Sequence, residues 1–290
     1  MVGVEPMESA REPSSLWDIA LPSRRSRLSG VTMAGFSDAA TDLVDLQVVP
    51  HPAVMLIFNL GDTPIVVDDA AGQQQRDSVV VGLAPIGARG HGGRSFECLQ
   101  VRLSPLAAHT VLGAASELGR AVVSLDNLWG RDAVRIQEQM RAAVSWDDRF
   151  AIADAALARR NAGRAVDPEV ASAWGRMLAS RGRIRVEQLA ADVGWSRKRL
   201  WSRFGSQIGL NPKRAIQLIR FDVAAHRLAG GYSPAEAAAE GGYVDQSHLH
   251  RDVVAFTGQT PTSVAHAPFL AVDDIAWPGA KSRRVDFDAS

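Results

Sequence analysis

The sequence predicts an α+β protein with two domains, an N-terminal antiparallel β-barrel with trailing helices and a C-terminal all-helical domain. The chain has 290 residues, which is the usual length of two domains. Short apolar runs separated by Gly, Asp and Pro turns fill residues 43–103, whereas apolar residues follow helical spacing from residue 105 onward. The helical part also contains an internal repeat, which is typical of a duplicated structural unit.

The strands of the first domain are expected at four apolar runs. Val54–Phe58 ends at an Asn-Leu-Gly-Asp turn, and Ile65–Asp68 follows that turn. Ser78–Leu83 is rich in Val, and Phe96–Leu103 alternates between apolar and polar residues. Short strands with turn residues between them favour a small antiparallel sandwich or barrel.

Helices are expected to close this first domain. Residues 106–118 are rich in Ala, and apolar residues recur at helical spacing over 134–144 and 150–157. These helices also offer a face for a homodimer. The polar segment 159–164 then places a domain boundary near residue 165.

The chain therefore divides into four segments. We expect a flexible lead-in over residues 1–30, because this stretch is polar and contains three prolines. The first domain covers 31–165 and the second covers 166–270. Residues 271–290 mix Pro, Gly and charged residues without a period, so we expect a flexible tail there.

Composition excludes several classes of protein. The single cysteine, Cys98, excludes a disulfide scaffold and a multi-cysteine metal site. The chain contains no run of apolar residues long enough to cross a membrane. The first 15 residues lack the apolar core of a signal peptide, so we expect a cytoplasmic protein without a membrane partner.

Charge is distributed unevenly along a chain whose formal net charge is zero. Residues 176–220 carry 11 basic and 2 acidic side chains, a net charge of +9. Residues 221–270 carry 2 basic and 5 acidic side chains, a net charge of −3. A strongly basic stretch in a neutral protein indicates a polyanionic or acidic partner, although a solvated helical surface is the simpler alternative.

The second domain contains one pattern twice. In each copy a Gly lies four residues after an Ala and directly before an aromatic residue. In each copy a Leu is followed by a Gly nine residues later and a Pro twelve residues later. These positions are Ala190, Gly194, Trp195, Leu200, Gly209 and Pro212 in the first copy, and Ala238, Gly242, Tyr243, Leu249, Gly258 and Pro261 in the second.

Each copy is interpreted as a helix-turn-helix. Two helices that cross steeply need a short turn, and Gly194 and Gly242 supply its positive φ. Ser196 and Asp245 are aligned as N-caps of the second helix in each copy. Residues 212–228 between the copies show the apolar spacing of a long linking helix.

Residues 167–266 resemble the paired helix-turn-helix domain of the AraC/XylS family of bacterial transcription regulators. The resemblance is strongest over Gly242–Arg251 and Phe256–Pro261, around the second reading helix. Val244 stands where that family usually has Ser, so capping falls to Asp245. Residues 101–130 are similar to the sensor half of one subgroup, which implies a cupin-like sensor and dimerisation domain over 31–165.

The resemblance implies a regulator of transcription that binds double-stranded DNA and works with RNA polymerase. Activation and repression are both left open, and so is a homodimer through the N-terminal domain. A small-molecule effector would bind in that domain, where His51 and His91 are weak candidates for ligand contacts. No cofactor is expected.

The second helix of each helix-turn-helix presents its N-terminal residues to the major groove. Arg and Lys favour guanine, and Gln pairs well with adenine. Trp201 is large enough to pack on a thymine methyl group. The residues expected to read bases are Arg197, Lys198, Trp201 and Ser202 in the first copy, and Gln246, Ser247, His250 and Arg251 in the second.

Other basic residues near the first copy are better suited to phosphates, because few side chains reach the base edges. They are Arg199, Arg203, Lys213, Arg214 and Arg220. The charge distribution predicts that the first copy supplies most of the phosphate affinity. The second copy is then expected to act mainly through specific base contacts.

Two other functions compete with this interpretation. A cupin-type metal enzyme with an appended DNA-binding domain would need a His-x-His pair with a Glu and a further His. The barrel region offers only the dispersed His51, His91 and His109, so we expect neither a metal nor an enzyme. A DNA-binding protein without an effector also fits, because nothing in residues 40–160 identifies a small molecule.

Overall fold

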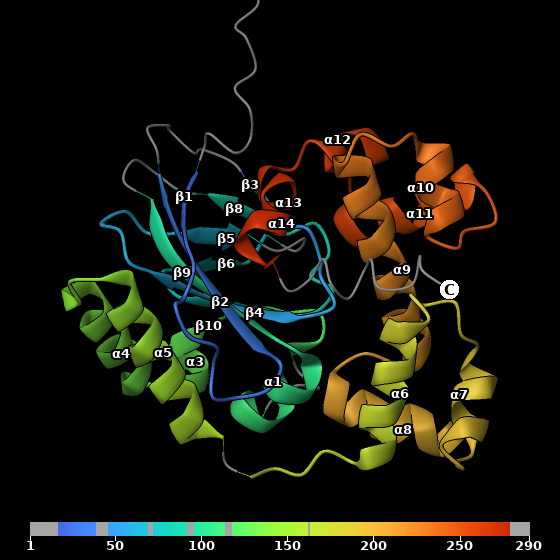
Figure 1. Ribbon diagram of the computed structural model, residues 1–290, viewed down its shortest axis with the longest axis horizontal. Helices are drawn as coiled ribbons and strands as arrows, with labels where there is room; N and C mark the ends of the chain where they lie inside the picture. The colour runs from blue at the N-terminus through green and yellow to red at the C-terminus, as the bar shows by residue number, and fades with distance from the viewer. Residues whose placement is uncertain are drawn as a thin grey trace, which may run out of the picture.

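The computed structural model describes residues 17–38, 46–68, 72–91, 96–113, 118–161 and 163–278. Strands fill the N-terminal part and helices the C-terminal part, so the predicted α+β class is confirmed (Figure 1). Strands form at each of the four apolar runs identified in the sequence.

The strands form two antiparallel sheets. The larger sheet has the order β1-β2-β9-β4-β7-β10, and the smaller has the order β3-β8-β5-β6. The larger sheet consists of β1 (Trp17–Ala20), β2 (Val31–Asp38), β9 (Glu97–Leu103), β4 (Val54–Asn59), β7 (Val79–Val81) and β10 (Val122–Ser124). The smaller sheet consists of β3 (Leu46–Gln47), β8 (Arg89–His91), β5 (Val66–Asp68) and β6 (Gln74–Arg76).

Strand β9 is the central element of the larger sheet, because it pairs with both β2 and β4. Its alternating side chains enter two different hydrophobic clusters. Leu99, Val101 and Leu103 pack in one cluster, and Cys98 packs with Phe36 in the other. Both faces of this strand are therefore buried, which is why its middle residues are buried without interruption.

Among the described residues, four helices accompany the two sheets, which we refer to together as the barrel. They are α1 (Pro105–Leu112), α3 (Leu125–Trp129), α4 (Arg131–Ala142) and α5 (Trp146–Arg160). Helix α1 is shorter than predicted, because Gly113 adopts a left-handed φ of 70° and ends it. Residues 114–117 lie outside the described residues. Helix α4 ends before Val144, which is 98% exposed, so that part of the predicted spacing is wrong.

The helical half is built around α9 (Pro212–Ala229), which has 18 residues and confirms the predicted linking helix. On one side of α9 lie α6 (Pro168–Ala179), α7 (Val186–Asp192) and α8 (Arg197–Ile208). On the other lie α10 (Pro234–Glu240), α11 (Gln246–Thr257) and α12 (Pro261–Ala265) (Figure 1). Among the described helices, none has the length and apolar character that a membrane span requires.

Part of each segment that was predicted to be flexible forms regular secondary structure. Residues Trp17–Ala20 of the expected lead-in form β1, which pairs with β2. Residues of the expected tail form α14 (Asp273–Ala276), which follows the short α13 (Pro268–Ala271). These two stretches are ordered because Trp17 stacks on Phe269 with ring centroids 4.7 Å apart, so each end buries the other.

The hydrophobic core does not stop at the boundary expected near residue 165. One cluster of buried side chains includes Leu56 and Val101 of the barrel together with Leu218 and Phe221 of α9. The boundary expected near residue 165 therefore does not separate two hydrophobic cores.

Cys98 provides a test of this packing. The side chain is fully buried, and burial raises the pKa of its thiol far above the ordinary value. We expect Cys98 to be unreactive toward a thiol reagent in the native protein and to react at once in denaturant, because the thiolate is the reactive form. Thiol titration measures the reaction. Rapid reaction of Cys98 in the native protein would contradict the packing of the barrel.

Candidate nucleic-acid interface

The first helix-turn-helix consists of α7 and α8. The turn between them contains Gly194, whose φ is +67°. The backbone N–H of Trp195 donates to the carbonyl of Ala190 over 2.9 Å and closes the turn. The hydroxyl of Ser196 accepts from the N–H of Arg199 over 3.2 Å and caps α8. The predicted positive φ and the predicted N-cap are both confirmed.

The second helix-turn-helix, formed by α10 and α11, repeats this geometry. Gly242 has a φ of +72°, and the N–H of Tyr243 donates to the carbonyl of Ala238 over 2.9 Å. The carboxylate of Asp245 accepts from the N–H of His248 over 2.7 Å and caps α11. The turns of the two copies thus have the same pattern of backbone hydrogen bonds.

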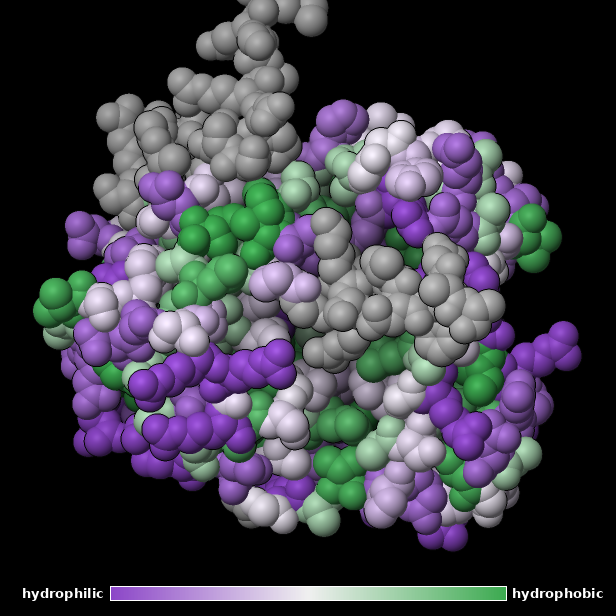
Figure 2. Space-filling view, viewed as in Figure 1, coloured by the Kyte–Doolittle hydropathy of each residue, from purple (hydrophilic) through white to green (hydrophobic). Residues whose placement is uncertain are grey.

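Most of the residues expected to read bases are exposed to solvent. All except Trp201 are exposed, and they occupy the first two turns of α8 and of α11. The Arg197 side chain is 62% exposed and lies 3.3 Å from the carboxylate of Glu187. Trp201 is half-buried, and its ring N–H is buried without a hydrogen-bond partner among the described residues. Figure 2 shows hydrophilic side chains over much of the outer edge of this helical half.

The residues expected to contact phosphates fall into two groups. Lys213 and Arg199 are exposed, and the Arg199 guanidinium lies 4.6 Å from the Trp195 ring centroid. Arg203 is exposed and donates two hydrogen bonds, of 2.7 and 2.8 Å, to the Asp167 carboxylate.

Arg214 and Arg220 instead make contacts within the domain. Arg214 donates to the carbonyl of Ala255 over 3.1 Å, and its guanidinium lies 3.6 Å from the Phe256 ring centroid. Arg220 is 17% exposed and lies 4.9 Å from the ring centroid of Tyr243. These contacts give both residues a structural role, since they tie α9 to the second helix-turn-helix.

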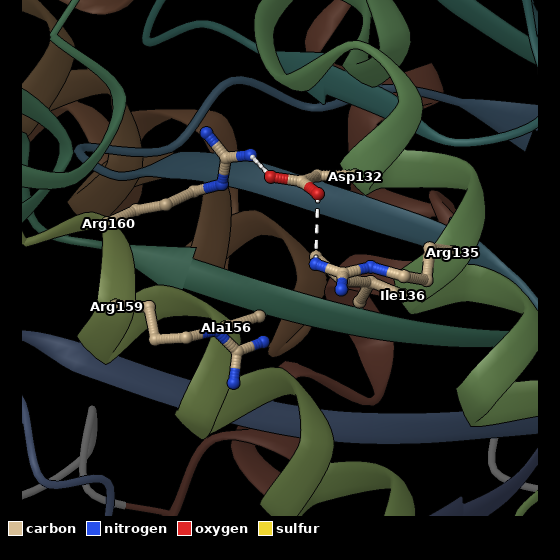
Figure 3. Close-up of a pocket in the computed structure, with 6 residues that line it drawn as sticks. All are labelled: Asp132, Arg135, Ile136, Ala156, Arg159 and Arg160. Atoms are coloured by element: carbon tan, nitrogen blue, oxygen red, sulfur yellow. Dashed lines mark hydrogen bonds and ion pairs between the residues drawn. The ribbon is translucent and has the colours of Figure 1, made fainter.

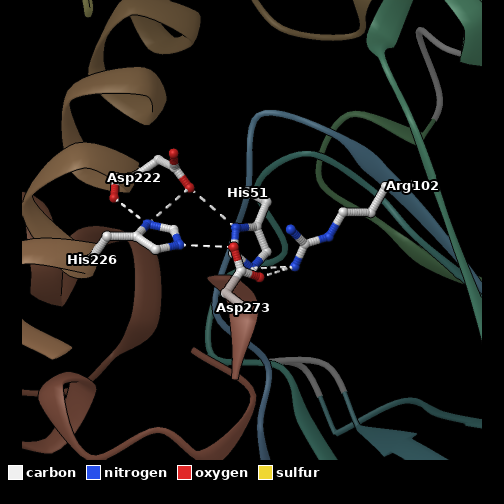
Figure 4. A network of polar contacts seen from close by, with 5 residues as sticks. All are labelled: His51, Arg102, Asp222, His226 and Asp273. Carbon is white, nitrogen blue, oxygen red and sulfur yellow. Dashed lines mark hydrogen bonds and ion pairs between the residues drawn. The ribbon is translucent and has the colours of Figure 1, made fainter. Parts of the chain in front are cut away.

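A buried polar cluster joins the barrel to this helical half (Figure 4). We call it the junction cluster, and it consists of His51, Arg102, Asp222, His226 and Asp273. Arg102 comes from β9, Asp222 and His226 from α9, and Asp273 from α14. No pattern in the sequence indicates this cluster, because its members lie far apart in the chain and Asp273 falls in a segment predicted to be a flexible tail.

Hydrogen-bond geometry fixes the protonation of the two histidines in the junction cluster. His226 faces the Asp222 carbonyl at 2.7 Å and the Asp273 carboxylate at 2.9 Å, so both of its ring nitrogens must donate. His51 faces the Asp222 carboxylate at 3.1 Å and the guanidinium of Arg102 at 3.2 Å, so one nitrogen donates and the other accepts. His226 is therefore cationic and His51 neutral.

The charges of the junction cluster balance. Arg102 and His226 provide two positive charges, and Asp222 and Asp273 provide two negative charges. Burial alone would raise the pKa of Asp273, but Arg102 and His226 hold that pKa well below its ordinary value. His51, His226 and Asp273 place potential metal-ligand atoms within 4.8 Å of one another. The Arg102 guanidinium donates to both Asp273 and His51. A side-chain cation therefore already lies beside these potential ligand atoms.

His91, the other weak candidate for a ligand contact, lies on β8 with its Nε2 3.0 Å from the Asp68 carboxylate.

A pocket of about 320 Å³ lies on the surface between α4 and α5 (Figure 3). Asp132 accepts from Arg160 over 2.7 Å and from Arg135 over 2.9 Å at its edge. Two of the three arginines that line this pocket therefore share one carboxylate, so the lining has a net positive charge.

Comparison with known proteins identifies the helical half. The helix-turn-helix domain family matches residues 189–267. An uncharacterised HTH-type transcriptional regulator of Bacillus subtilis, YbfI, is 33% identical over 66 residues, which are 23% of this chain and 24% of that protein. The chain thus matches only about a quarter of this relative's length. The family match confirms the paired helix-turn-helix domain and its resemblance to AraC/XylS regulators over these residues.

Solved structures that align with this chain include two bacterial proteins. ToxT of Vibrio cholerae aligns over 84% of this chain and 99% of its own, with 9% identity and a TM-score of 0.48. The C-terminal domain of AraT, a response regulator of Geobacillus stearothermophilus, aligns over 34% of this chain and 85% of its own, with 20% identity and a TM-score of 0.33.

The turn geometry predicts opposite effects for one substitution at two glycines. Gly194→Ala places a side chain at positive φ and should lower the free energy of unfolding by about 1–2 kcal/mol. Gly205→Ala, inside α8 with open space around it, should raise that free energy by up to about 1 kcal/mol. Chemical denaturation of both variants measures the difference. Equal effects would show that the backbone conformation of Gly194 is ordinary.

The junction cluster predicts a pH dependence. Burial, and then Arg102, lower the pKa of His51, with the two aspartates opposing them. The unfolded chain therefore binds a proton at His51 more readily, so this contribution to stability is complete above about pH 6.5 and is lost as pH falls through the lower folded-state pKa. Replacing His51 by Gln should remove this part of the pH dependence of unfolding. An unchanged pH profile would contradict the assigned neutral state.

Proposed function

We propose that this chain is a sequence-specific DNA-binding regulator of transcription whose reading helices α8 and α11 enter successive major grooves. The observation that carries the proposal is the duplicated turn, which leaves the N-terminal ends of both reading helices exposed. Reading helices of this kind lie about 34 Å apart along one face of the DNA.

Base recognition falls to the exposed residues at these ends. Arg197 and Lys198 are suited to guanine, and Gln246 is suited to adenine. The half-buried Trp201 offers part of its ring to a thymine methyl group. The remaining candidates are Ser202, Ser247, His250 and Arg251. Because the two copies differ in sequence, the preferred site is not a palindrome.

Phosphate contacts come from the exposed basic residues near the first copy. We assign them to Lys213 and Arg199, and to Arg203 once its pair with Asp167 opens. This copy lies within the stretch of net charge +9, whereas the second lies within a stretch of net charge −3. The first copy should therefore hold DNA of any sequence, and the second should add selectivity.

The N-terminal domain is proposed to control this activity through an effector or a protein partner. A homodimer through α4 and α5, an interaction with RNA polymerase and a cytoplasmic location complete the proposal. The chain is not proposed to be an enzyme. A DNA-binding protein without an effector remains the second candidate, and a thermal-shift screen with metabolites separates the two.

Selection from random DNA tests the main proposal. The full chain should enrich a site with two different halves, and the logarithm of its affinity should fall linearly with the logarithm of salt concentration, because bound phosphates release counterions. Absence of any enriched sequence would reject the proposal.

Two exposed lysines give a matched pair of variants. Lys198→Ala should cost about 1–3 kcal/mol of binding to the selected site and relax its preference at one position. Lys213→Ala should weaken binding to all sequences alike and reduce the salt slope by about 1. Titrations on selected and random duplexes at several salt concentrations measure both. Identical behaviour of the two variants would contradict the assigned roles.

A further inference from the structure

The barrel contacts both reading helices at their C-terminal ends. Gly209 ends α8, and a Cβ added to Gly119 would lie 1.8 Å from its carbonyl oxygen, so the two backbones touch. Gly258 ends α11, and a Cβ added there would lie 3.9 Å from the Cα of Gly87. The side chain of Gln47 also donates to the carbonyl of Thr257 over 3.5 Å.

The opposite ends of the same helices remain open. Lys198 near the start of α8 and Gln246 at the start of α11 are exposed while the barrel is docked. The barrel therefore does not cover the proposed DNA surface. The contacts at the C-terminal ends instead allow it to set the positions of the two helices.

Two connections join the reading helices. The first is α9, a single helix that can bend and twist. The second runs through the barrel, and it is complete only if the barrel is fixed to α9 and to the second helix-turn-helix. A frame with two connections is stiffer than one helix, and a stiff frame loses less entropy when it binds.

The hydrophobic core that the barrel shares with α9 gives part of that fixation. The segment Pro268–Trp277, which we call the strap, adds a polar contact at the junction cluster. It follows the second helix-turn-helix and lies between the strands and α9 (Figure 1). Phe269 stacks on Trp17, and the Trp277 ring centroid lies 4.2 Å from the Arg102 guanidinium. Between them, the 1% exposed Asp273 accepts from Arg102 of the barrel and from His226 of α9 (Figure 4).

We propose that Asp273 is a positioning residue for DNA recognition, because it fixes the barrel to α9 and so makes the barrel a second brace between the two reading helices. The inference rests on the proposed function. A buried carboxylate held by a cation on each side suits this role, because its geometry leaves little freedom and removing its charge disturbs both pairs.

A spacing experiment on the full chain tests the proposal. The site selected from random DNA is compared with duplexes in which one base pair is inserted or deleted between its halves. The wild type should bind the original spacing about tenfold better than the altered ones. Asp273→Asn should lose most of this ratio, because its affinity falls for the original spacing and changes little for the others. Asp18→Asn, an exposed carboxylate on β1, is the matched control and should keep the ratio.

A wild-type spacing ratio in Asp273→Asn would overturn the inference and leave the proposed function intact, whereas failure of the wild type to select any site would reject the proposed function itself. Arg102→Gln removes the same contact from the side of the barrel and should reduce the spacing ratio to the same extent. The double variant should add little to either single change, as expected for residues that act through one contact.

A distance measurement needs no DNA. Val144→Cys and Val244→Cys place labels on side chains that are 98% and 87% exposed, and the native Cys98 is fully buried. Electron spin resonance should give one narrow label distance in the otherwise wild-type chain and a broad distribution when Asp273→Asn is added. An equally narrow distribution in both would show that the strap does not brace the frame.

Discussion

The organisation of the helical half depends on one sharp turn that is made twice. In each copy an aromatic residue donates its N–H to the carbonyl of an Ala five positions earlier, across a Gly at positive φ. This hydrogen bond fixes the angle between the two helices, and the angle decides which side of the second helix is buried. Leu200 and Leu249 then face the core, while the N-terminal residues of α8 and α11 face outward. The exposed surface that is proposed to read DNA is thus a consequence of backbone geometry.

The sequence predicts the local features well because their causes are local. Ser196 and Asp245 cap their helices as expected, and the glycines that end α8 and α11 adopt left-handed φ. Strands form at the predicted apolar runs for the same reason. Helix α1 was predicted too long, since one Gly within an Ala-rich stretch was not taken as its end.

The junction could not be predicted, because its causes are distant. No spacing in the chain relates His51 to Asp222 or Arg102 to Asp273. The segment around Asp273 has no hydrophobic period. It is ordered because it packs against Trp17 and because Arg102 and His226 donate to Asp273. The roles of Arg214 and Arg220 show the same limit, since composition indicates that a residue is basic but not whether its guanidinium faces solvent or a neighbouring helix.

The strap also sets the order in which the molecule is completed during synthesis. Every partner of Asp273 in the junction cluster precedes it in the chain, and the nearest, His226, is 47 residues earlier. At about 5–20 residues per second, a ribosome needs roughly 2–10 s to make the chain between them. Throughout that interval the residues of the strands and of the first helix-turn-helix have been synthesised, while Arg102 and His226 still lack the Asp273 carboxylate that links them. The nascent protein therefore passes through a stage in which β9 and α9 have been synthesised but are not yet linked by Asp273, and α13 and α14 complete the junction.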